Sequence, residues 1–234
     1  MAGSAARIRG ARVRWRAIEP TGVTAAKQKR ESLPVNPGNG MSAKNVAVQR
    51  LSEGSRPELA RHFLSLGRED VRLRFGVVIS AAAIAQYVER IDFDADAVFG
   101  VYDEELALAA VAHVAFTEDM AELGVSVLPA YRGRGLGSAL LARAAEHVRN
   151  RFVTRLFMHC LAENAAMMHI ARKLGMDICV DTGEADAFVR LPPADPASVT
   201  GEFVEQRLAL FDYALKSQAI RIRELAASAR RSEG

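Results

Sequence analysis

The sequence is poor in cysteine and has no long apolar run. Only two of its 234 residues are cysteines, Cys160 and Cys179, and they form neither a spaced metal-binding motif nor a disulfide framework. The longest apolar run, residues 106–115, is interrupted by His113 and is too short to cross a bilayer. We therefore expect a cytoplasmic protein without a membrane span, with both thiols free in the core and no metal site.

Aromatic residues are also scarce, at 6% of the chain, whereas hydrophobic residues make up 50%. A chain of this length and composition can bury a sizeable core built mainly of aliphatic side chains. We expect one folded domain of ordinary size with extensions at its ends.

Charge is distributed unevenly along the chain. The net charge is +3, but the first 44 residues alone carry +7, which leaves −4 for residues 45–234. The basic residues of this leader are Arg7, Arg9, Arg12, Arg14, Arg16, Lys27, Lys29, Arg30 and Lys44, against Glu19 and Glu31. It lacks apolar periodicity and contains three prolines, so we predict that residues 1–44 are disordered.

Three interpretations of the basic leader stay open. It is a nucleic-acid-binding arm, an organelle transit peptide, or an upstream extension without function, since Met41 would also serve as a start. The first would make the chain a nucleic-acid-associated protein, with binding that weakens steeply with salt. Because the rest of the chain is net acidic, we do not expect nucleic acid to be its main partner.

The central part of the chain, residues 45–193, mixes strand and helix patterns. We expect a helix after Ser55, with Glu58 completing a capping box, and another that begins near Ser80. The predicted strands cover residues 45–51, 97–102, 106–116, 121–128 and 156–160, followed by a hairpin over 177–191 that turns at Thr182-Gly183. A further helix over 164–174 is closed by Gly175. This order predicts an α/β (α+β) fold.

The C-terminal segment, residues 194–234, is predicted to be a helix and a short tail. Apolar residues separated by fours and threes mark a long amphipathic helix over residues 198–229: Val204, Leu208, Phe211, Leu215, Ile222 and Leu225, interrupted only by Gln218. Such a seam needs a partner. It packs either on the chain's own domain or against the same helix of a second copy in a homodimer.

A glycine-rich turn, RGRGLG at residues 132–137, lies between the strand predicted over residues 121–128 and the helix that follows it. Its glycines allow a ligand to approach the backbone, and the N–H groups at the start of a helix favour an anion such as a phosphate. The turn lacks the lysine of the phosphate loop of nucleotide hydrolases, and its glycine spacing differs from the dinucleotide-binding fingerprint. Neither of these two nucleotide sites fits.

The turn and a second motif downstream resemble the GNAT (GCN5-related N-acetyltransferase) superfamily over residues 45–191. The turn has the superfamily's pattern at Arg132, Gly135 and Gly137, and Val127, Pro129 and Tyr131 precede it as expected. The second motif runs from Asn164 to Met176 and contains Lys173-Leu174-Gly175. The resemblance implies a mixed, mostly antiparallel central sheet flanked by helices, here extended by the long C-terminal helix.

The same resemblance implies acetyl-CoA as the co-substrate. The backbone of the turn would hold its pyrophosphate and the preceding strand its pantetheine, with Asn164 near the cofactor. The implied binding residues are Val125, Val127, Arg132, Gly133, Arg134, Gly135, Leu136, Gly137, Ser138 and Asn164. As a helix cap, Asn164 also has a purely structural explanation.

The second motif departs from the superfamily at one position. Many members carry a tyrosine four residues before the glycine, placed to protonate the leaving thiolate, and this chain has Ala171 there. Together with Arg74-Phe75, Ile91-Asp92 and Ala121-Glu122, this departure is similar to bacterial GNAT domains that acetylate protein lysines. That similarity implies that Glu122 is the general base.

Acid–base chemistry gives an independent reason to examine Glu122. An alkyl amine has a pKa near 10.4, so it must lose a proton before it attacks a thioester. Along an extended strand Glu122 shares a face with Gly124 and Ser126, whose small side chains would leave room for substrate. The acid that protonates the leaving thiolate would then be Ser126 or a water, or no acid would be needed. Secondary candidates are His113, Glu118, Asp119, His159 and Cys160.

We therefore predict an acyl-CoA-dependent N-acyltransferase. It would transfer an acetyl group from acetyl-CoA to a primary amine, a protein lysine or a small molecule, by direct attack in a ternary complex. The alternative is a catalytically silent GNAT domain that binds acyl-CoA as a regulatory or interaction module.

Overall fold

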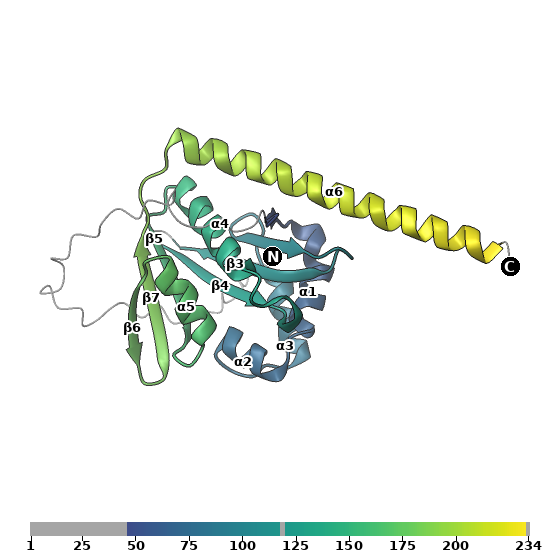
Figure 1. Cartoon of the computed structure of the whole chain (residues 1–234). Coiled ribbons are helices and arrows are strands. Elements are labelled where there is room, and N and C mark those ends of the chain that lie inside the picture. Colours follow the sequence, from purple (N-terminus) through teal and green to yellow (C-terminus); the bar gives the residue numbers. More distant parts are fainter. Residues whose placement is uncertain (1–45, 118–119, 233–234) are drawn as a thin grey trace, which may run out of the picture. The chain divides into compact units, whose positions relative to one another are not determined.

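The computed structural model of the chain describes residues 46–117 and 120–232, and the predictions for the basic leader, Glu118 and Asp119 lie outside them. A seven-stranded sheet organises the described residues, in the order β1-β2-β3-β4-β5-β7-β6 (Figure 1). Every neighbouring pair is antiparallel except β4 and β5, which are parallel. The predicted mixed, mostly antiparallel sheet is confirmed.

Apart from α2, the strands and helices follow one another in the order that the sequence predicted. The strands are β1 (Gln49–Arg50), β2 (Ala97–Tyr102), β3 (Leu108–Phe116), β4 (Ala121–Val127), β5 (Arg155–Leu161), β6 (Asp177–Asp181) and β7 (Glu184–Arg190). The α-helices are α1 (Arg56–Leu64), α2 (Arg68–Phe75), α3 (Ala81–Glu89), α4 (Leu136–Asn150), α5 (Ala165–Lys173) and α6 (Pro196–Ser232). Short 3₁₀ helices cover Glu53–Ser55 and Pro129–Tyr131.

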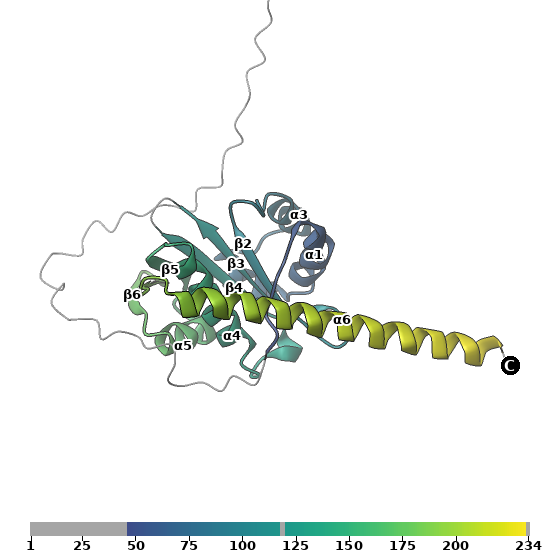
Figure 2. The same cartoon turned by 90° about the horizontal axis from the view of Figure 1, so that it is seen from above.

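Two hydrophobic layers enclose the sheet, one on each face (Figure 2). The helices α1, α2 and α3 cover one face, where Leu59, Phe63 and Val88 pack on Val98 and Val111. On the other face α4 inserts its apolar side between the strands and α5. Alternate residues of β4 therefore point to different layers, because side chains of a strand alternate between the faces of its sheet.

The helix starts on the α1–α3 face follow the predictions only in part. Ser80 caps α3, since its hydroxyl accepts the backbone N–H of Ala83. Ser55 does not cap α1: its hydroxyl accepts the N–H of Ser52 instead, because the chain enters α1 through a 3₁₀ turn. The capping box predicted at Ser55 and Glu58 is therefore wrong.

Two other segments differ from the prediction. The first strand is shorter than residues 45–51 and comprises only Gln49 and Arg50, since the chain turns into a 3₁₀ helix after it. Residues 67–80, for which the sequence pattern predicted neither a helix nor a strand, contain α2. Acidic residues in its first turn and arginines in its last turn stabilise this helix through the helix dipole. The prediction missed the helix because it relied on the spacing of apolar residues.

The final hairpin is formed as predicted. β6 and β7 pair from Asp177↔Phe188 to Asp181↔Glu184, so two residues make the turn. Thr182 and Gly183 both have positive φ, +47° and +88°, as a tight hairpin turn requires. The turn residues therefore fix the register of this edge of the sheet.

The parallel pair β4 and β5 opens at the centre of the sheet. The two strands pair only at Ala121↔Leu156 and Glu122↔Phe157, after which β4 continues to Val127 without a ladder partner on that side. The opening points toward the start of α4, which follows β4 through the glycine turn (Figure 1). This gap positions the candidate site.

The C-terminal helix is formed as predicted and is slightly longer. α6 extends over 37 residues, and its first half contacts α4 and β1. Among the residues that the structure describes, no helix combines the length and apolar character that a bilayer span requires.

Candidate active site

The glycine turn before α4 has the geometry of an anion cradle. Gly133 and Gly135 adopt φ of +74° and +82°, and a Cβ at either would meet nothing within 4 Å, so the backbone there is open on its outer side. Gly135 is the N-cap of α4, and its lack of a side chain leaves the first N–H groups of the helix without a side-chain cap. These N–H groups and the helix dipole favour a phosphate.

Gly137 has a different role within the same turn. A Cβ there would lie 2.8 Å from Ile170 Cδ1, so this glycine permits close packing of α4 against α5. Leu136 is buried and anchors the helix, while Ser138 lies half-buried in its first turn. The turn therefore combines two open glycines with one that packs.

The two arginines of the turn already have partners in the protein. Arg132 forms an ion pair with Asp70 of α2, at 2.6 Å, and donates from Nε to the carbonyl of Val127. Arg134 donates to the carbonyl of Ala130 and lies over the ring of Tyr131. Both arginines shape the turn, and an anion there would be held chiefly by backbone N–H groups.

The exposed edge of β4 offers further donors toward the gap. Leu128 donates its N–H to Ala109 on the β3 side, and backbone groups alternate sides along a strand. The N–H groups of Val125 and Val127 therefore point to the other side, where β5 has diverged. These two residues suit a polar chain lying in the gap, as the sequence predicted.

Two residues of the second motif, Asn164 and Ala171, have structural roles within the protein. Asn164 caps α5, accepting the N–H of Met167, and its Nδ2 donates to the carbonyl of Leu73 in α2. Ala171 is 1% exposed in the core beneath α4, and its methyl side chain has no proton to donate. Both contacts of Asn164 are made within the protein.

Glu122 lies at the closed end of the gap, where β4 and β5 last pair. Burial raises the pKa of its carboxyl, opposed by the positive charge of Arg74 and by His159 and His113, while Asp186 adds to the rise. A half-buried carboxylate with a raised pKa is suited to accept a proton at neutral pH.

A chain of hydrogen bonds with one direction runs beside Glu122. His113 Nε2 contacts the carboxylate of Asp96 at 3.1 Å and must donate to it, so Nδ1 accepts from the hydroxyl of Tyr87 at 2.8 Å. Tyr87 in turn accepts from Arg74 Nη2 at 3.0 Å. These hydrogen bonds hold Arg74 and His113 in place, and they were not evident from sequence because their members come from four separate segments.

Arg74 occupies space that the sequence assigned to substrate. A Cβ on Gly124 would lie 2.5 Å from the Arg74 guanidinium, which therefore rests directly on this glycine. Phe63, Phe75 and Tyr87 surround the same guanidinium at 4.9–5.9 Å. Glu122, Gly124 and Ser126 share the predicted face, but the expectation that the small residues leave an empty space is wrong.

Ser126 is paired with a histidine that the sequence did not single out. His62 Nδ1 lies 2.7 Å from the carbonyl of Leu108 and must donate to it, so Nε2 accepts the hydroxyl proton of Ser126 at 2.7 Å. Burial lowers the pKa of His62 to about 4, outweighing the contact with Leu108. The Ser126 proton is therefore directed at His62.

This pair predicts a pH dependence of stability. Because the folded pKa of His62 is about 4, below 6.5 in the unfolded chain, the unfolded state binds more protons between these values. The free energy of unfolding should fall, as pH drops from 6.5 to 4, by up to about 3 kcal/mol more in the wild type than in His62→Gln. Chemical denaturation at both pH values measures this, and parallel losses in the two proteins would contradict it.

The two secondary candidates on β5 point to opposite faces of the sheet. His159 Nδ1 contacts Asp186 at 2.7 Å on the face that carries Glu122. Cys160 is buried among Met168 and Ala185, and burial raises the pKa of its thiol. A protonated, enclosed thiol is not suited to be a nucleophile. Cys179 is exposed, so the expectation that both thiols lie in the core is wrong for this residue.

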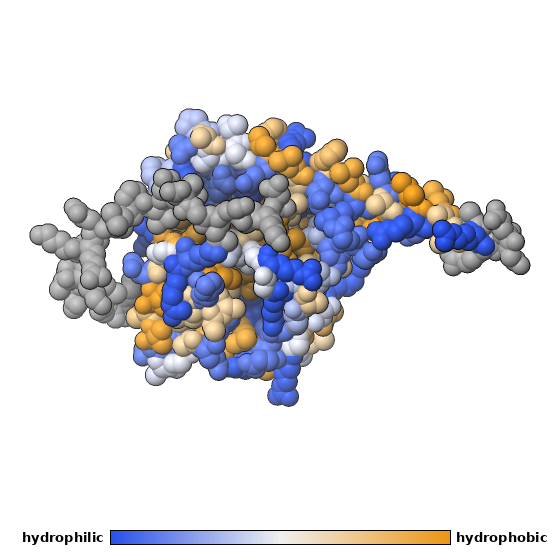
Figure 3. Space-filling model, viewed as in Figure 1, coloured by the Kyte–Doolittle hydropathy of each residue, from blue (hydrophilic) through white to orange (hydrophobic). Residues whose placement is uncertain are grey.

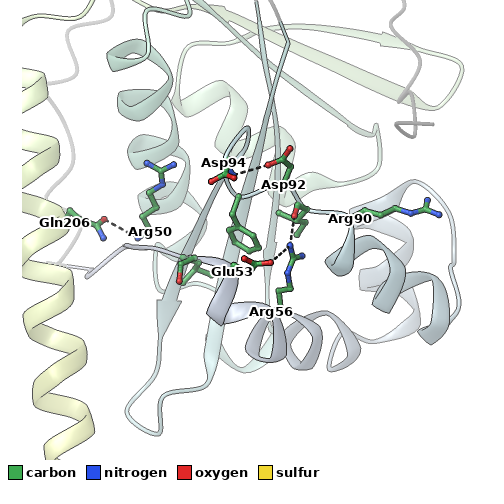
Figure 4. A pocket seen from close by; sticks show the side chains of 11 residues that line it. Arg50, Glu53, Arg56, Arg90, Asp92, Asp94 and Gln206 are labelled. Carbon is green, nitrogen blue, oxygen red and sulfur yellow. Dashed lines mark hydrogen bonds and ion pairs between the residues drawn. The ribbon is translucent and has the colours of Figure 1, made fainter. Parts of the chain in front are cut away.

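A pocket of about 700 Å³ lies elsewhere, between the start of α1, the end of α3 and α6 (Figure 4). Among its lining residues, Arg56 donates to the carbonyls of Val88 and Ile91 and forms an ion pair with Glu53. None of the predicted site residues lines it. We assign the site to the gap between β4 and β5 because Glu122 lies at one end of this gap and the open glycine turn lies at the other.

Metal ligands do not accompany the site. Within residues 46–117 and 120–232, no group of three or more His, Cys, Asp or Glu side chains is arranged to hold a metal ion.

Comparison with known proteins finds similarity to acetyltransferases. Residues 72–176 match the model of the acetyltransferase (GNAT) family. Streptothricin acetyltransferase from Streptomyces lavendulae is 32% identical over 78 residues, which span 33% of this chain and 41% of that relative's length. The segment that matches the family model contains Glu122, the glycine turn and the Asn164 motif.

Solved structures agree on the fold. The GNAT domain of the S. lividans protein PAT superposes with a TM-score of 0.54 at 21% identity, covering 62% of this chain and 89% of that one. A phosphinothricin acetyltransferase from Sinorhizobium meliloti, in complex with acetyl-CoA, gives 0.52 at 17% identity, covering 64% of this chain and 95% of that one. The predicted GNAT fold is confirmed.

Proposed function

We propose that the chain is an acyl-CoA-dependent N-acyltransferase that moves an acetyl group from acetyl-CoA to a primary amine. The observation that carries this proposal is that a half-buried carboxylate and an open glycine turn lie at the two ends of one gap in the sheet. The similarity of residues 72–176 to the acetyltransferase (GNAT) family supports it.

The residues present fit acetyl-CoA. The N–H groups of residues 133–138, at the start of α4, would bind the pyrophosphate, and those of Val125 and Val127 would bind the pantetheine along the edge of β4. When bound, acetyl-CoA supplies a thioester carbonyl that an amine can attack. A backbone N–H of β4 that faces the gap would stabilise the negative charge that develops on the carbonyl oxygen.

Glu122 is proposed as the general base. It would take a proton from the ammonium form of the acceptor, directly or through a water, and so free the lone pair for attack. Its raised pKa makes this transfer easier than for an exposed carboxylate. His113, which contacts Asp96 and Tyr87, and His159, which contacts Asp186, lie near enough to influence that pKa.

The leaving thiolate needs no protein acid in this proposal. A thiol has a pKa near 8.5 and leaves readily as the anion. The sequence left Ser126 as a candidate acid, but its hydroxyl donates a hydrogen bond to His62. Ala171 has no proton to donate. We expect Ser126→Ala to keep kcat within about fivefold of the wild type, while a loss of about 100-fold or more would identify Ser126 as the acid. Steady-state rates of thiol release measure this.

The acceptor is proposed to be a cationic amine, a protein lysine or a small molecule. Carboxylates border the gap beyond Glu122: Asp186 and Glu184 lie on β7, next to His159. Such a border favours a positively charged acceptor. A panel of lysine peptides, polyamines and streptothricin would identify the class, the last included because of the relative named for it.

Two-substrate initial rates test the proposed mechanism. With acetyl-CoA and an amine both varied, direct transfer in a ternary complex predicts converging double-reciprocal lines. Parallel lines would indicate an acyl-enzyme instead. Acetyl-CoA binding without turnover on every amine would support the silent regulatory module. The second partner that we propose, another copy of the chain, does not depend on this chemistry.

A further inference from the structure

The side of α6 that faces its own domain is polar. Glu202 binds Arg143, His147 and Asn150 of α4, and although burial acts to raise its pKa, the hydrogen bonds from His147 and Asn150 lower it to about 2. Further contacts along the helix are those of Gln206 with the N–H of Arg50, of Lys216 with the carbonyl of Tyr102, and of Arg223 with Glu105. Hydrogen bonds and ion pairs dominate these contacts.

The opposite side of α6 is apolar and uncovered. Figure 3 shows the apolar residues along the outer edge of this helix. Six of them are between 48% and 71% exposed: Val204, Leu208, Phe211, Leu215, Ile222 and Leu225. An ordinary amphipathic helix of a monomer has the reverse arrangement, with its apolar stripe toward the core.

The exposed residues have the spacing of a coiled coil. From Val204 to Leu225 the steps are four, three, four, three, four and three residues, with Gln218 at the one polar position. In a heptad abcdefg this places Leu208, Leu215 and Ile222 at a, and Val204, Phe211 and Leu225 at d. The domain-facing contacts fall at b and f, as those of Ala209 and Tyr213 do, so the seam points away from the domain.

We propose that this seam pairs with the same seam of a second copy, in a two-stranded coiled coil. Six large apolar side chains expose on the order of 600 Å², at the top of the range for the largest patch on a monomer. Flanking e and g residues bring the area near the roughly 800 Å² per partner of a stable interface. The seam spans about 32 Å of helix, enough for three heptads.

Charges beside the seam select a parallel pairing. In a parallel coiled coil, Arg207 at g lies opposite Asp212 at e of the second copy, and the symmetry makes this contact twice. Full antiparallel overlap would place Arg207 opposite Arg221 and the two Asp212 residues near each other. Like charges there are unfavourable, and the polar Gln218 disfavours shifted registers.

Sedimentation equilibrium of the full chain tests the pairing. We expect a dimer whose dissociation constant rises at least about 100-fold in Leu208→Glu/Leu215→Glu, because each change places a charge in the seam. Leu210→Glu is the matched control: Leu210 is 42% exposed on α6 but lies at position c, so the dimer should persist. Circular dichroism checks that each variant stays folded.

Two results would overturn the proposal. One is a wild-type chain that stays monomeric at every concentration, which would leave the seam to another partner. The other is a dimer that survives the double change with an unaltered dissociation constant.

A cysteine scan decides the direction of the helices. With Cys179, which is exposed, replaced by serine, Leu225→Cys should form a disulfide between the two copies under mild oxidation. In an antiparallel pair the two sites would be far apart. A dimer that forms no such disulfide would exclude the parallel arrangement.

Discussion

Replacing Glu122 by glutamine should lower kcat/KM for the amine about 10²- to 10⁴-fold, the range that a general base contributes. Glutamine keeps the size of the side chain and cannot take up a proton, so the loss reports on proton transfer. The fall should be in kcat, with the affinity for acetyl-CoA unchanged, since the carboxylate lies at the closed end of the gap and the pyrophosphate would lie at the glycine turn.

The pH profile of the wild type belongs to the same prediction. A base works only when it is ionised, so kcat/KM should fall as pH drops through the raised pKa of Glu122. This acidic limb should disappear from the residual activity of Glu122→Gln. The thermal midpoint of the variant at pH 7 should rise, because the folded state disfavours the charged carboxylate relative to the unfolded chain.

Glu146→Gln is the matched control for both effects. Burial also raises the pKa of Glu146, which lies on α4 beside Gly201 of α6. This variant should gain stability in the same way while keeping wild-type kcat. Full activity in Glu122→Gln would show that another group is the base.

Replacing Gly135 by valine should raise the dissociation constant of acetyl-CoA at least tenfold. A β-branched residue is strained at φ of +82°, so the turn must change its backbone. Each hydrogen bond from an N–H to a charged phosphate contributes about 1.5–3 kcal/mol, so losing one is enough for the effect. Isothermal titration with CoA and with acetyl-CoA measures it without requiring turnover.

Gly183→Val separates this effect from general destabilisation. Gly183 has φ of +88° at the tip of the β6–β7 hairpin, and a Cβ there also meets nothing within 4 Å. Both variants should lose stability to a similar degree, and only Gly135→Val should lose affinity for CoA. Equal affinities in the two variants would contradict the assignment of the turn.

The glycine turn could be predicted from sequence because its signal is local. Glycines at the junction of a strand and a helix have few alternatives, and the order of elements around them restricts the topology. The same holds for Thr182-Gly183 and for Ser80, where neighbouring backbone decides the outcome.

The interior of the site could not be predicted in this way. Arg74 rests on Gly124, and His62 accepts from Ser126, across 50 and 64 positions of the chain. Spacing within one strand correctly placed Glu122, Gly124 and Ser126 on one face but carried no information about what covers it. Ser55 failed as a cap for a related reason, since a 3₁₀ turn in front of α1 took its hydroxyl.

The sequence predicted only part of what the structure shows for α6. Its length and seam followed from the spacing of apolar residues, whereas the side that meets the domain did not. That side is chosen by polar partners such as Glu202 with Arg143 and His147, and hydrophobic periodicity does not detect these.

The most direct test of the proposed activity is the stoichiometry of transfer by the wild-type chain. Acetyl-CoA is incubated with the amine panel, and free CoA thiol and N-acetylated amine are quantified in the same samples. We expect equal amounts of both with at least one cationic amine, at a rate proportional to enzyme concentration. Acetyl-CoA binding with no thiol released on any amine would contradict it.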